Sequence, residues 1–255
     1  MSAIPLLEAQ SISKRFGHVQ ALDGANFSVY PAEICALIGD NGAGKSTLVK
    51  ILSGADRPDT GRILLEGREV AFNGPLAAQA LGIATVYQDL ALAPDLAASD
   101  NLFLGREIVR GGALGRFGFL DRREMRARAA LQFARLSVRL PSPRVPVSAL
   151  SGGQRQSVAI ARAAMWADKV IFMDEPTAAL GVAQTARVID LIRQVRDQGI
   201  AVVLISHNMT QVIDIADRVE VLRLGKRVAR IDKSAATVES LVTAMTSATE
   251  REEAA

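Results

Sequence analysis

The chain of 255 residues has one cysteine, little net charge and no long hydrophobic run. Because Cys35 is the single cysteine, an internal disulfide is excluded and a reducing compartment is expected. Its 30 basic and 27 acidic side chains leave a formal charge of +3, which is too close to balance to indicate nucleic acid as a partner. No apolar stretch approaches the ~18 residues of a membrane-spanning helix, and residues 1–8 lack the basic and apolar regions of a signal peptide. We therefore expect neither segment, so other chains would have to supply any channel for a solute.

Hydrophobic residues make up 49% of the sequence, and one short stretch organises the rest. Residues 39–47 fit the phosphate-loop pattern G-x-x-x-x-G-K-[ST], between an apolar run of strand length and apolar residues at helical spacing. Glycines let the backbone bring several N–H groups onto one phosphate, and the helix that starts there adds its positive dipole end. Lys45 supplies a charge for the outer phosphates, and Ser46 offers a hydroxyl to Mg²⁺. The residues predicted to bind a nucleoside triphosphate are Gly39, Asp40, Asn41, Gly42, Ala43, Gly44, Lys45, Ser46 and Thr47.

Two carboxylates follow another apolar run, at the point where a predicted strand ends. Residues 170–173 are followed directly by Asp174 and Glu175. A carboxylate at the carboxyl end of a parallel strand, beside a phosphate loop, is placed where Mg²⁺ needs an oxygen ligand, which favours Asp174. On an extended chain Glu175 points to the other side, where it could polarise the attacking water as a general base.

Gln88 and His207 also follow predicted strands, at residues 83–87 and 201–205. Taken alone, Gln88 is either an ordinary loop residue or an amide that ligates Mg²⁺ or orients water. His207 alone is either a structural or solvated side chain, or a contact to the γ-phosphate. Its position at the same strand-end edge as the other polar groups favours the phosphate contact.

The middle of the chain, roughly residues 89–150, differs in sequence pattern from the parts on either side and is predicted to be a helical insert. Five glycines and little periodicity predict a mobile surface loop at 105–118. Asp121 is expected to cap the next helix, with Glu124 as its capping-box partner. The arginines of that helix are interpreted as a solvated face, with a protein contact as the alternative, and they are Arg122, Arg123, Arg126 and Arg128.

Residues 150–154, Leu-Ser-Gly-Gly-Gln, open a further helix that is expected to run to about Trp166. Paired glycines before a helix offer another anion-binding terminus. Near the start of the chain, Phe16 could stack on adenine or simply pack in a sheet edge. The remaining predicted strands are 6–13, 25–30, 62–66, 69–72, 219–224 and 226–231, and the remaining predicted helices are 75–81, one that begins near 99 and one that begins at 237.

Together these motifs resemble the ATP-binding-cassette (ABC) ATPases, in the order and at the spacings of that family. The matching parts are the phosphate loop, Gln88, the 150–154 signature, the Asp174-Glu175 strand end and His207. The resemblance implies an α/β fold with a phosphate-loop (RecA-like) three-layer core. It also implies an N-terminal antiparallel β subdomain and a helical insert that carries the signature.

The resemblance assigns a role to each matching residue. Lys45 and Ser46 would hold phosphate and Mg²⁺, and Phe16 would stack on adenine. Gln88 would sense the metal and couple the site to a permease. The implied catalytic residues are Glu175 as base, His207 on the γ-phosphate, and Gln88. The implied metal ligands are Ser46, Gln88 and Asp174. The signature residues that would contact ATP held by the opposite subunit are Ser151, Gly152, Gly153 and Gln154.

The same resemblance implies one nucleotide-binding domain over residues 1–255. Its parts would be a core at about 1–88 and 163–248, a helical subdomain at about 89–162, and a disordered tail at 249–255. Many family members have Asp where this chain has Gly181, so the role of that Asp across the dimer cannot be carried over. The amino-acid sequence at 86–90, 177–182 and 205–209 resembles that of bacterial monosaccharide importers, and most of all those of the fructose type.

The implied function is an ATPase that drives uptake of a monosaccharide through a separate permease, with ATP and Mg²⁺ in the site. The implied partners are a second copy of the chain, integral-membrane permease subunits and, indirectly, an extracytoplasmic sugar-binding protein, with no nucleic acid. The chain would be peripheral, at the cytoplasmic face of the inner membrane. The alternatives are a cassette ATPase for another solute, a soluble cassette of the cluster-assembly type, and a phosphotransferase, which has no use for the Ser151 signature.

Overall fold

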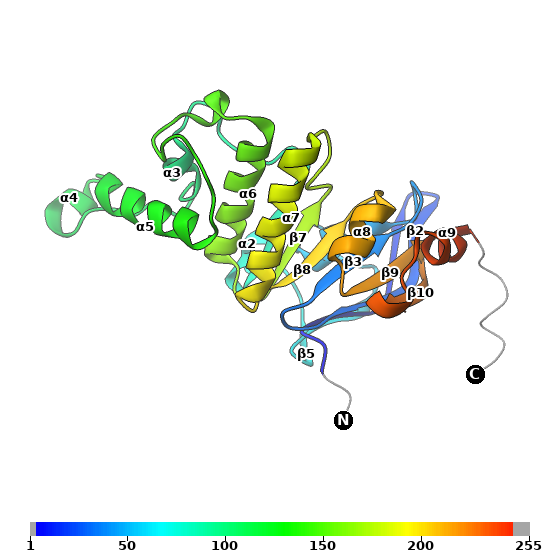
Figure 1. The fold of residues 1–255 in the computed structure, drawn as a ribbon. Helices are drawn as coiled ribbons and strands as arrows, with labels where there is room; N and C mark the ends of the chain where they lie inside the picture. Colours follow the sequence, from blue (N-terminus) through cyan, green and yellow to red (C-terminus); the bar gives the residue numbers. More distant parts are fainter. Residues whose placement is uncertain (1–3, 247–255) are drawn as a thin grey trace.

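The computed structural model describes residues 4–246, apart from the side chains of residues 113 and 114. Strands and helices are arranged around two sheets, with a helical region at one end (Figure 1). The strands are β1 (Leu7–Phe16), β2 (Val19–Val29), β3 (Ile34–Ile38), β4 (Thr60–Leu65), β5 (Arg68–Val70), β6 (Ile83–Val86), β7 (Val170–Asp174), β8 (Ala201–Ile205), β9 (Arg218–Arg223) and β10 (Lys226–Asp232). The helices are α1 (Lys45–Leu52), α2 (Pro75–Ala80), α3 (Ala98–Asn101), α4 (Gly112–Arg116), α5 (Arg122–Arg135), α6 (Gly152–Trp166), α7 (Val182–Asp197), α8 (Met209–Ile215) and α9 (Val238–Thr246). The predicted tail at 249–255 lies outside the described residues.

Within residues 4–246, six of the strands form a mainly parallel sheet in the order β10-β9-β3-β8-β7-β6. Its central pairs are parallel, and β10 runs antiparallel to β9 at one edge. The register aligns the strand ends, because Leu37 lies opposite Ile205, Ile205 opposite Asp174, and Met173 opposite Val86. The polar residues that follow these strands therefore gather at one edge of the sheet. The predicted strands at 34–38, 83–87, 170–173 and 201–205 are confirmed.

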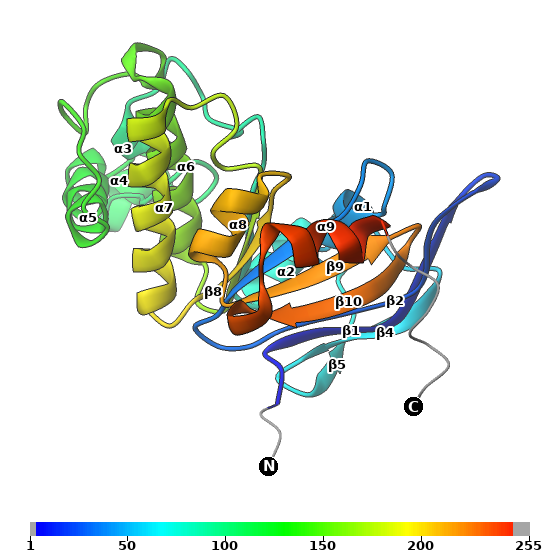
Figure 2. The same cartoon turned by 45° about the vertical axis from the view of Figure 1, so that its right-hand side comes forward.

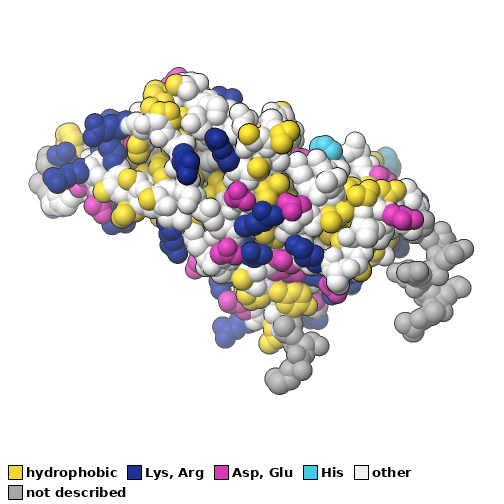
Figure 3. Space-filling model, viewed as in Figure 1, with side chains coloured by type: hydrophobic (Ala, Val, Ile, Leu, Met, Phe, Trp, Pro, Cys, Tyr) yellow, Lys and Arg dark blue, Asp and Glu magenta, His cyan; other side chains and the backbone are white. Residues whose placement is uncertain are grey.

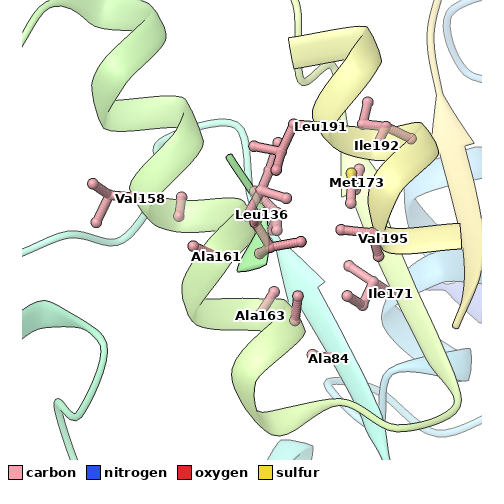
Figure 4. Packing of buried hydrophobic residues seen from close by; sticks show 14 of the residues in the cluster. Ala84, Leu136, Val158, Ala161, Ala163, Ile171, Met173, Leu191, Ile192 and Val195 are labelled. Carbon is pink, nitrogen blue, oxygen red and sulfur yellow. The ribbon is translucent and has the colours of Figure 1, made fainter. Parts of the chain in front are cut away.

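Both faces of this sheet are covered, which gives the three-layer arrangement expected from the resemblance. Val170 and Phe172 pack with α1 and the second sheet, whereas Ile171 and Met173 pack with α6 and α7. Figure 4 shows Ile171 and Met173 lying toward Val195 of α7. A strand that is buried on both faces has no polar alternation, so its continuous apolar sequence follows from its place in the middle layer.

The second sheet is antiparallel, with the order β2-β1-β4-β5 among the described strands, and it lies under the first (Figure 2). The hairpin of β1 and β2 extends further than the predicted strands at 6–13 and 25–30, because the pairing continues through polar residues to Phe16 opposite Val19. The end of the first strand was therefore predicted too early, and the start of the second strand too late. Cross-strand hydrogen bonds, which a local pattern does not reveal, keep this polar part of the hairpin extended.

A buried ion cluster joins the two sheets. Arg218 of β9 donates from Nε to Glu33 Oε1 at 2.7 Å and from Nη2 to the Ser28 carbonyl of β2 at 2.7 Å, and it also pairs with Glu220. Arg230 of β10 donates to the hydroxyl of Ser28 at 2.8 Å. Since each buried carboxylate has guanidinium partners, the charges are compensated where the sheets meet.

The helical region carries α3 to α6, and Figure 3 shows Lys and Arg side chains over the end formed by α4 and α5. Asp121 caps α5 as predicted, accepting from the Glu124 N–H at 3.0 Å. The predicted capping box is only half formed, because the Glu124 carboxylate pairs with Arg128 at 2.7 Å and the Asp121 N–H donates to the Ile108 carbonyl. Arg122, Arg123 and Arg128 are exposed, as a solvated face requires, whereas Arg126 is half-buried.

The prediction of a loop at 105–118 was wrong in the middle of that range, because residues Gly112–Arg116 form the short helix α4. An isolated bridge between Val109 and Leu120 closes the base of this segment. Closing the base shortens the effective loop and removes part of the entropy that would oppose a turn of helix. No helix among residues 4–246 is long and apolar enough to cross a bilayer.

Candidate nucleotide-binding and hydrolysis site

The phosphate loop joins β3 to α1, in the strand-loop-helix order that the sequence predicted. Gly39 has φ 149°, and a Cβ there would lie 2.1 Å from the Leu222 carbonyl oxygen. Gly44 has φ 99°, and its Cβ would lie 2.6 Å from the Ala21 carbonyl oxygen. These contacts leave room for glycine alone. Gly44 is also the N-cap of α1 and offers no capping side chain, so N–H groups of the first turn are left for an anionic ligand.

Lys45 begins α1 and is half-buried, with its ammonium folded against its own loop. Its Nζ donates to the carbonyls of Gly39 at 2.7 Å and Asp40 at 2.9 Å. Burial lowers the pKa of Lys45, and the carboxylates of Glu175, Asp40 and Asp174 act in the opposite direction. The lysine and the strand-end carboxylates therefore share one electrostatic environment, as expected for a site that binds both phosphates and a cation.

Asp174 is the last residue of β7, and Glu175 follows it. Strand β7 pairs with β8, which pairs in turn with β3, the strand that leads into the phosphate loop. Burial and the nearby Glu175 carboxylate raise the pKa of Asp174, and Lys45 lowers it. Glu175 has φ 50°, in the left-handed region, so the expectation of an extended chain at this residue was wrong. Its N–H donates to the Ile205 carbonyl at 3.0 Å, which continues the contact between β7 and β8 while the chain turns. Such a conformation costs a non-glycine residue roughly 1–3 kcal/mol, and strained residues of this kind cluster at functional sites.

His207 lies two residues beyond β8, and its ring contacts the carboxylate of Glu175. The distance from Nδ1 to Oε1 is 2.7 Å, and the imidazole is largely exposed, with 80% of its side chain accessible. A hydrogen bond of this length needs the proton on Nδ1 or on the carboxyl group. The sequence predicted both residues at this edge but not their contact, because the two positions are 32 residues apart.

Gln88, Ser46 and Phe16 are the other predicted site residues on this side. Gln88 is exposed and lies two residues past the end of β6. Ser46 is exposed in the first turn of α1. Phe16 is 49% exposed at the end of the β1–β2 hairpin, with the Lys14 Nζ 5.4 Å from its ring centroid. The same hairpin passes the phosphate loop at Ala21, so an exposed ring on it is available to a ligand bound there.

The signature begins α6, where Ser151 is the N-cap. Its hydroxyl accepts from the Gln154 N–H at 3.3 Å, and the Gln154 side chain accepts from the Ser151 N–H at 3.0 Å, which completes a capping box. Gly152 is half-buried and Gly153 is buried, and a Cβ at Gly153 would lie 3.1 Å from the Gln184 side chain of α7. A cavity of about 360 Å³ opens beside the signature, between α6 and α7.

The structure does not bring the signature to the phosphate loop of the same chain. Between residues 39–47 and 151–154, both fully described, there is no hydrogen bond or salt bridge. Gly181, where the family pattern often has Asp, is the N-cap of α7 and provides no side-chain cap. The site residues therefore form two groups, one at the strand ends and one at the start of α6.

Two contacts near the site were not predicted. Thr177 donates its hydroxyl to the Gln211 side chain of α8 at 2.5 Å, which ties the turn after Glu175 to the helix after His207. Arg162 of α6 donates to the backbone after Gln88. No spacing rule links residues so far apart. The one available signal was an arginine among apolar and alanine residues on the signature helix.

Comparisons with known proteins agree with this geometry. The family model described as ABC transporter matches residues 22–178. The chain is 49% identical to the fructose import ATP-binding protein FrcA of Rhizobium meliloti, over 98% of this chain and 97% of that protein. It is 45% identical to the xylose/arabinose import ATP-binding protein XylG of Sulfolobus acidocaldarius, over 95% and 94%. It is 44% identical to the ribose import ATP-binding protein RbsA 1 of Burkholderia ambifaria, where it covers 96% of this chain but 47% of that protein.

Solved structures with similar folds come from the same family. A nucleotide-free ATP-binding cassette from an ABC transporter superposes with a TM-score of 0.80 at 26% identity, covering 94% of this chain and 95% of that one. The ADP conformation of an ATP-binding cassette of an ABC transporter gives 0.80 at 26% identity, covering 95% and 98%. The predicted fold class is confirmed by these structures and by the two sheets described above. The chain therefore belongs to the ABC transporter family, and it has the fold of that family's ATP-binding cassettes.

Proposed function

We propose that this chain is the ATP-hydrolysing subunit of an importer that takes up a monosaccharide through a separate membrane permease. The observation that carries the proposal is the combination of a complete phosphate loop with nearly full-length similarity to proteins named for fructose and xylose/arabinose import. The site supports the ATPase part by itself, because an anion cradle, a lysine and two carboxylates meet at one sheet edge.

ATP would be held by the phosphate loop, with Lys45 on the outer phosphates and Phe16 on the adenine ring. The oxygen ligands available for Mg²⁺ are the Ser46 hydroxyl, the Asp174 carboxylate and the Gln88 amide, which are the hard donors that this ion prefers. Among the described residues, no cluster of three His, Cys, Asp or Glu side chains could form a closed metal cage. A site with one carboxylate fits Mg²⁺, which is usually shared between the protein and substrate phosphates. When bound, the ion would neutralise charge on the phosphates.

Glu175 is the proposed general base, and His207 its partner. The 2.7 Å contact orients the carboxylate and keeps the imidazole at the strand edge. With a proton on each ring nitrogen, His207 would donate from Nδ1 to Glu175 and from Nε2 to the γ-phosphate. The turn at Glu175 aims the side chain away from the line of β7. The carboxylate then accepts the proton of the attacking water as the oxygen–phosphorus bond forms, and ADP leaves with the electrons of the broken bond.

Two copies of the chain are proposed to complete each site. Within one chain the signature makes no hydrogen bond or salt bridge with residues 39–47, whereas Ser151, the N-cap of α6, is exposed at the surface. The start of a helix attracts anions, so Ser151, Gly152, Gly153 and Gln154 would close over ATP held by the partner. ATP then drives closure, because it supplies contacts that the ATP-free pair lacks.

The permease is proposed to dock on the segment that follows Gln88. A cavity of about 240 Å³ lies there, lined by Asp89, Leu90, Leu92, Pro94, Val147, Ser148 and Arg155. An extracytoplasmic sugar-binding protein would act indirectly through the permease, and the chain would sit peripherally at the cytoplasmic face of the inner membrane. We also propose the division into a core at about 1–88 and 163–248 and a helical subdomain at about 89–162.

The proposal is tested in two steps. The purified chain should hydrolyse ATP with Mg²⁺ and stop when EDTA removes the metal. Reconstituted in vesicles with its permease and binding protein, it should be stimulated by binding protein loaded with fructose, xylose or ribose. Hydrolysis without stimulation by any of these sugars, while another solute stimulates it, would retain the ATPase and reject the monosaccharide. Failure to associate with any membrane subunit would favour a cluster-assembly type of cassette.

A further inference from the structure

The segment after Gln88 has a strained backbone that something else must hold. Between β6 and α3 the chain forms no regular helix or strand, and Leu90 and Ala91 have φ 62° and 44°. Two successive non-glycine residues in the left-handed region are uncommon, because Cβ crowds the neighbouring carbonyl oxygen. The turn that contains them is closed locally by one hydrogen bond, from the Leu90 N–H to the Tyr87 carbonyl at 3.0 Å.

Arg162 of α6 supplies the missing support. Its Nη2 donates to the Leu90 carbonyl at 2.8 Å, and its Nη1 donates to the Ala91 carbonyl at 2.6 Å. The planar guanidinium is suited to two oxygens presented side by side, and a lysine ammonium cannot reproduce that fork. Within residues 4–246 Arg162 forms no ion pair, so its donors are committed to backbone geometry. Burial lowers the pKa of Arg162, and the nearby Asp89 carboxylate acts in the opposite direction.

The same helix holds the far end of the segment. Trp166 donates its indole N–H to the Leu102 carbonyl at 2.7 Å, and its ring meets Phe103 edge to face at 5.8 Å. The chain between Gln88 and the end of α3 is therefore attached to α6 near both of its ends. At its other end α6 begins at Ser151, and an uninterrupted α-helix transmits a displacement along its axis without much bending.

We propose that Arg162 is a positioning residue that fixes the Gln88 segment to the signature helix, so that Gln88 and Ser151 move as one body. The inference rests on the proposed function, because Gln88 and Ser151 act on nucleotide only if the site hydrolyses ATP. When Gln88 binds at one nucleotide, its displacement then also moves the start of α6, which faces the nucleotide of the partner copy. Loss of Arg162 leaves the phosphate loop intact but frees the Gln88 segment.

The test is a double-mutant cycle on the full chain, with ATP hydrolysis as the readout. Arg162→Met keeps an apolar stem and removes the fork, and we expect kcat to fall about ten-fold while KM for ATP stays within about two-fold. Gln88→Ala should also lower kcat. Combining the two substitutions should lower kcat little further than Gln88→Ala alone, because Arg162 acts through that segment. Independent losses that multiply in the double variant would overturn the proposal.

Two further variants separate positioning from general stability. Ala91→Gly relieves the strain at a left-handed position and should restore part of the kcat that Arg162→Met loses. Ala32→Gly is the matched control, because Ala32 has φ 52° and is exposed, but makes no contact with Arg162. Rescue by both glycines, or by neither, contradicts the proposal.

Arg162→Lys covers the case in which Arg162→Met does not fold. It keeps the charge and one donor direction, so an intermediate kcat at unchanged KM is expected, and parental kcat would reject the need for a fork. A parent chain without ATPase activity rejects the proposed function, whereas an active parent with parental Arg162→Lys and Arg162→Met variants rejects only the role of Arg162.

Discussion

The strand-end edge and the signature end of α6 are built in different ways, although both are proposed to contact nucleotide. At the strand ends, the glycine loop and the parallel register bring backbone N–H groups, Lys45 and the carboxylates together at one edge of the sheet. At the signature end, a capping box fixes the start of α6, and side chains of α6 contact the backbone of a distant segment. The difference is that the first group depends on a tight glycine loop and strand register, whereas the second depends on a helix cap and on contacts of one helix with a distant segment. Substitutions should therefore affect chemistry and binding at one end, and coupling and helix stability at the other.

The largest effect is expected at the strand ends, from Glu175→Gln. Replacing the proposed base should lower kcat by ~10²–10⁴, the usual contribution of a positioned general base, while ATP still binds. Steady-state hydrolysis and equilibrium ATP titration measure the two quantities separately. Turnover close to that of the parent would remove Glu175 from the mechanism.

Lys45→Ala should affect binding more than any substitution at the signature. Charge-assisted hydrogen bonds to phosphate are worth about 1.5–3 kcal/mol, so ATP affinity should fall roughly 10- to 100-fold. Isothermal titration with ATP checks this, and Lys169→Ala is the control, since Lys169 pairs with Glu66 and precedes the start of β7, at the end opposite the site. Equal affinity in the parent and in Lys45→Ala would mean that the lysine does not reach the phosphates.

The geometry of the phosphate loop is tested by a pair of glycine substitutions. Gly44→Ala combines a left-handed φ with a 2.6 Å clash against the Ala21 carbonyl, so urea unfolding should show a loss of about 2–4 kcal/mol. Gly42→Ala has φ 83° but nothing within 4 Å, so its loss should be about 1–2 kcal/mol. Equal losses would show that close approach, as opposed to backbone conformation, contributes nothing at Gly44.

The signature end is tested by comparing two helix caps. Ser151→Ala and Asp121→Ala each remove an N-cap, so both should destabilise the fold by about 1 kcal/mol. Only Ser151→Ala should also lower ATP hydrolysis, because only Ser151 is proposed to contact the partner's nucleotide. A decrease of the same size in both variants would reduce the signature serine to a structural cap.

The smallest expected effect concerns Asp174 and pH. Because its pKa is raised in the folded protein, ionisation of this carboxyl group opposes folding, and the penalty grows between the unfolded-state pKa and the folded-state pKa and is complete above the latter. Asp174→Asn should therefore raise Tm by roughly 1–3 °C at pH 7. The gain should shrink as the pH falls below the folded-state pKa and disappear below the ordinary carboxyl pKa of 3.8, where the group is neutral in both states. Thermal melts at pH 7 and at about pH 3.5 measure it, and a gain that persists in acid would assign the effect to packing instead.

Much of the fold could be predicted because its signals are local. The apolar runs that became β3, β7 and β8 needed only their length and composition, and the phosphate loop needed only its glycines and lysine. Helices α7 and α8 were not predicted. Among the residues of α7 the buried positions include Val188, Leu191, Ile192 and Val195, which do show helical spacing, so that signal was present and missed.

Other features depended on neighbours that are distant in sequence. The extension of β1 to Phe16 follows from pairing with β2, and the left-handed turn at Glu175 accompanies its hydrogen bond to Ile205 of β8. The contact between Glu175 and His207 requires two adjacent parallel strands that end at the same level. The fork of Arg162 on Leu90 and Ala91 joins segments more than 70 residues apart.

By itself, the sequence determined which residues can cradle a phosphate, which runs must be buried strands, and which helix starts with a serine and two glycines. These depend on φ preferences, side-chain type and spacing within a few residues, all of which are local quantities. The tertiary structure alone decided that Glu175 meets His207, that the signature stays apart from its own phosphate loop, and that Arg162 holds the Gln88 segment. Those outcomes depend on strand register and helix packing, which arise only when distant parts of the chain bury their apolar faces together.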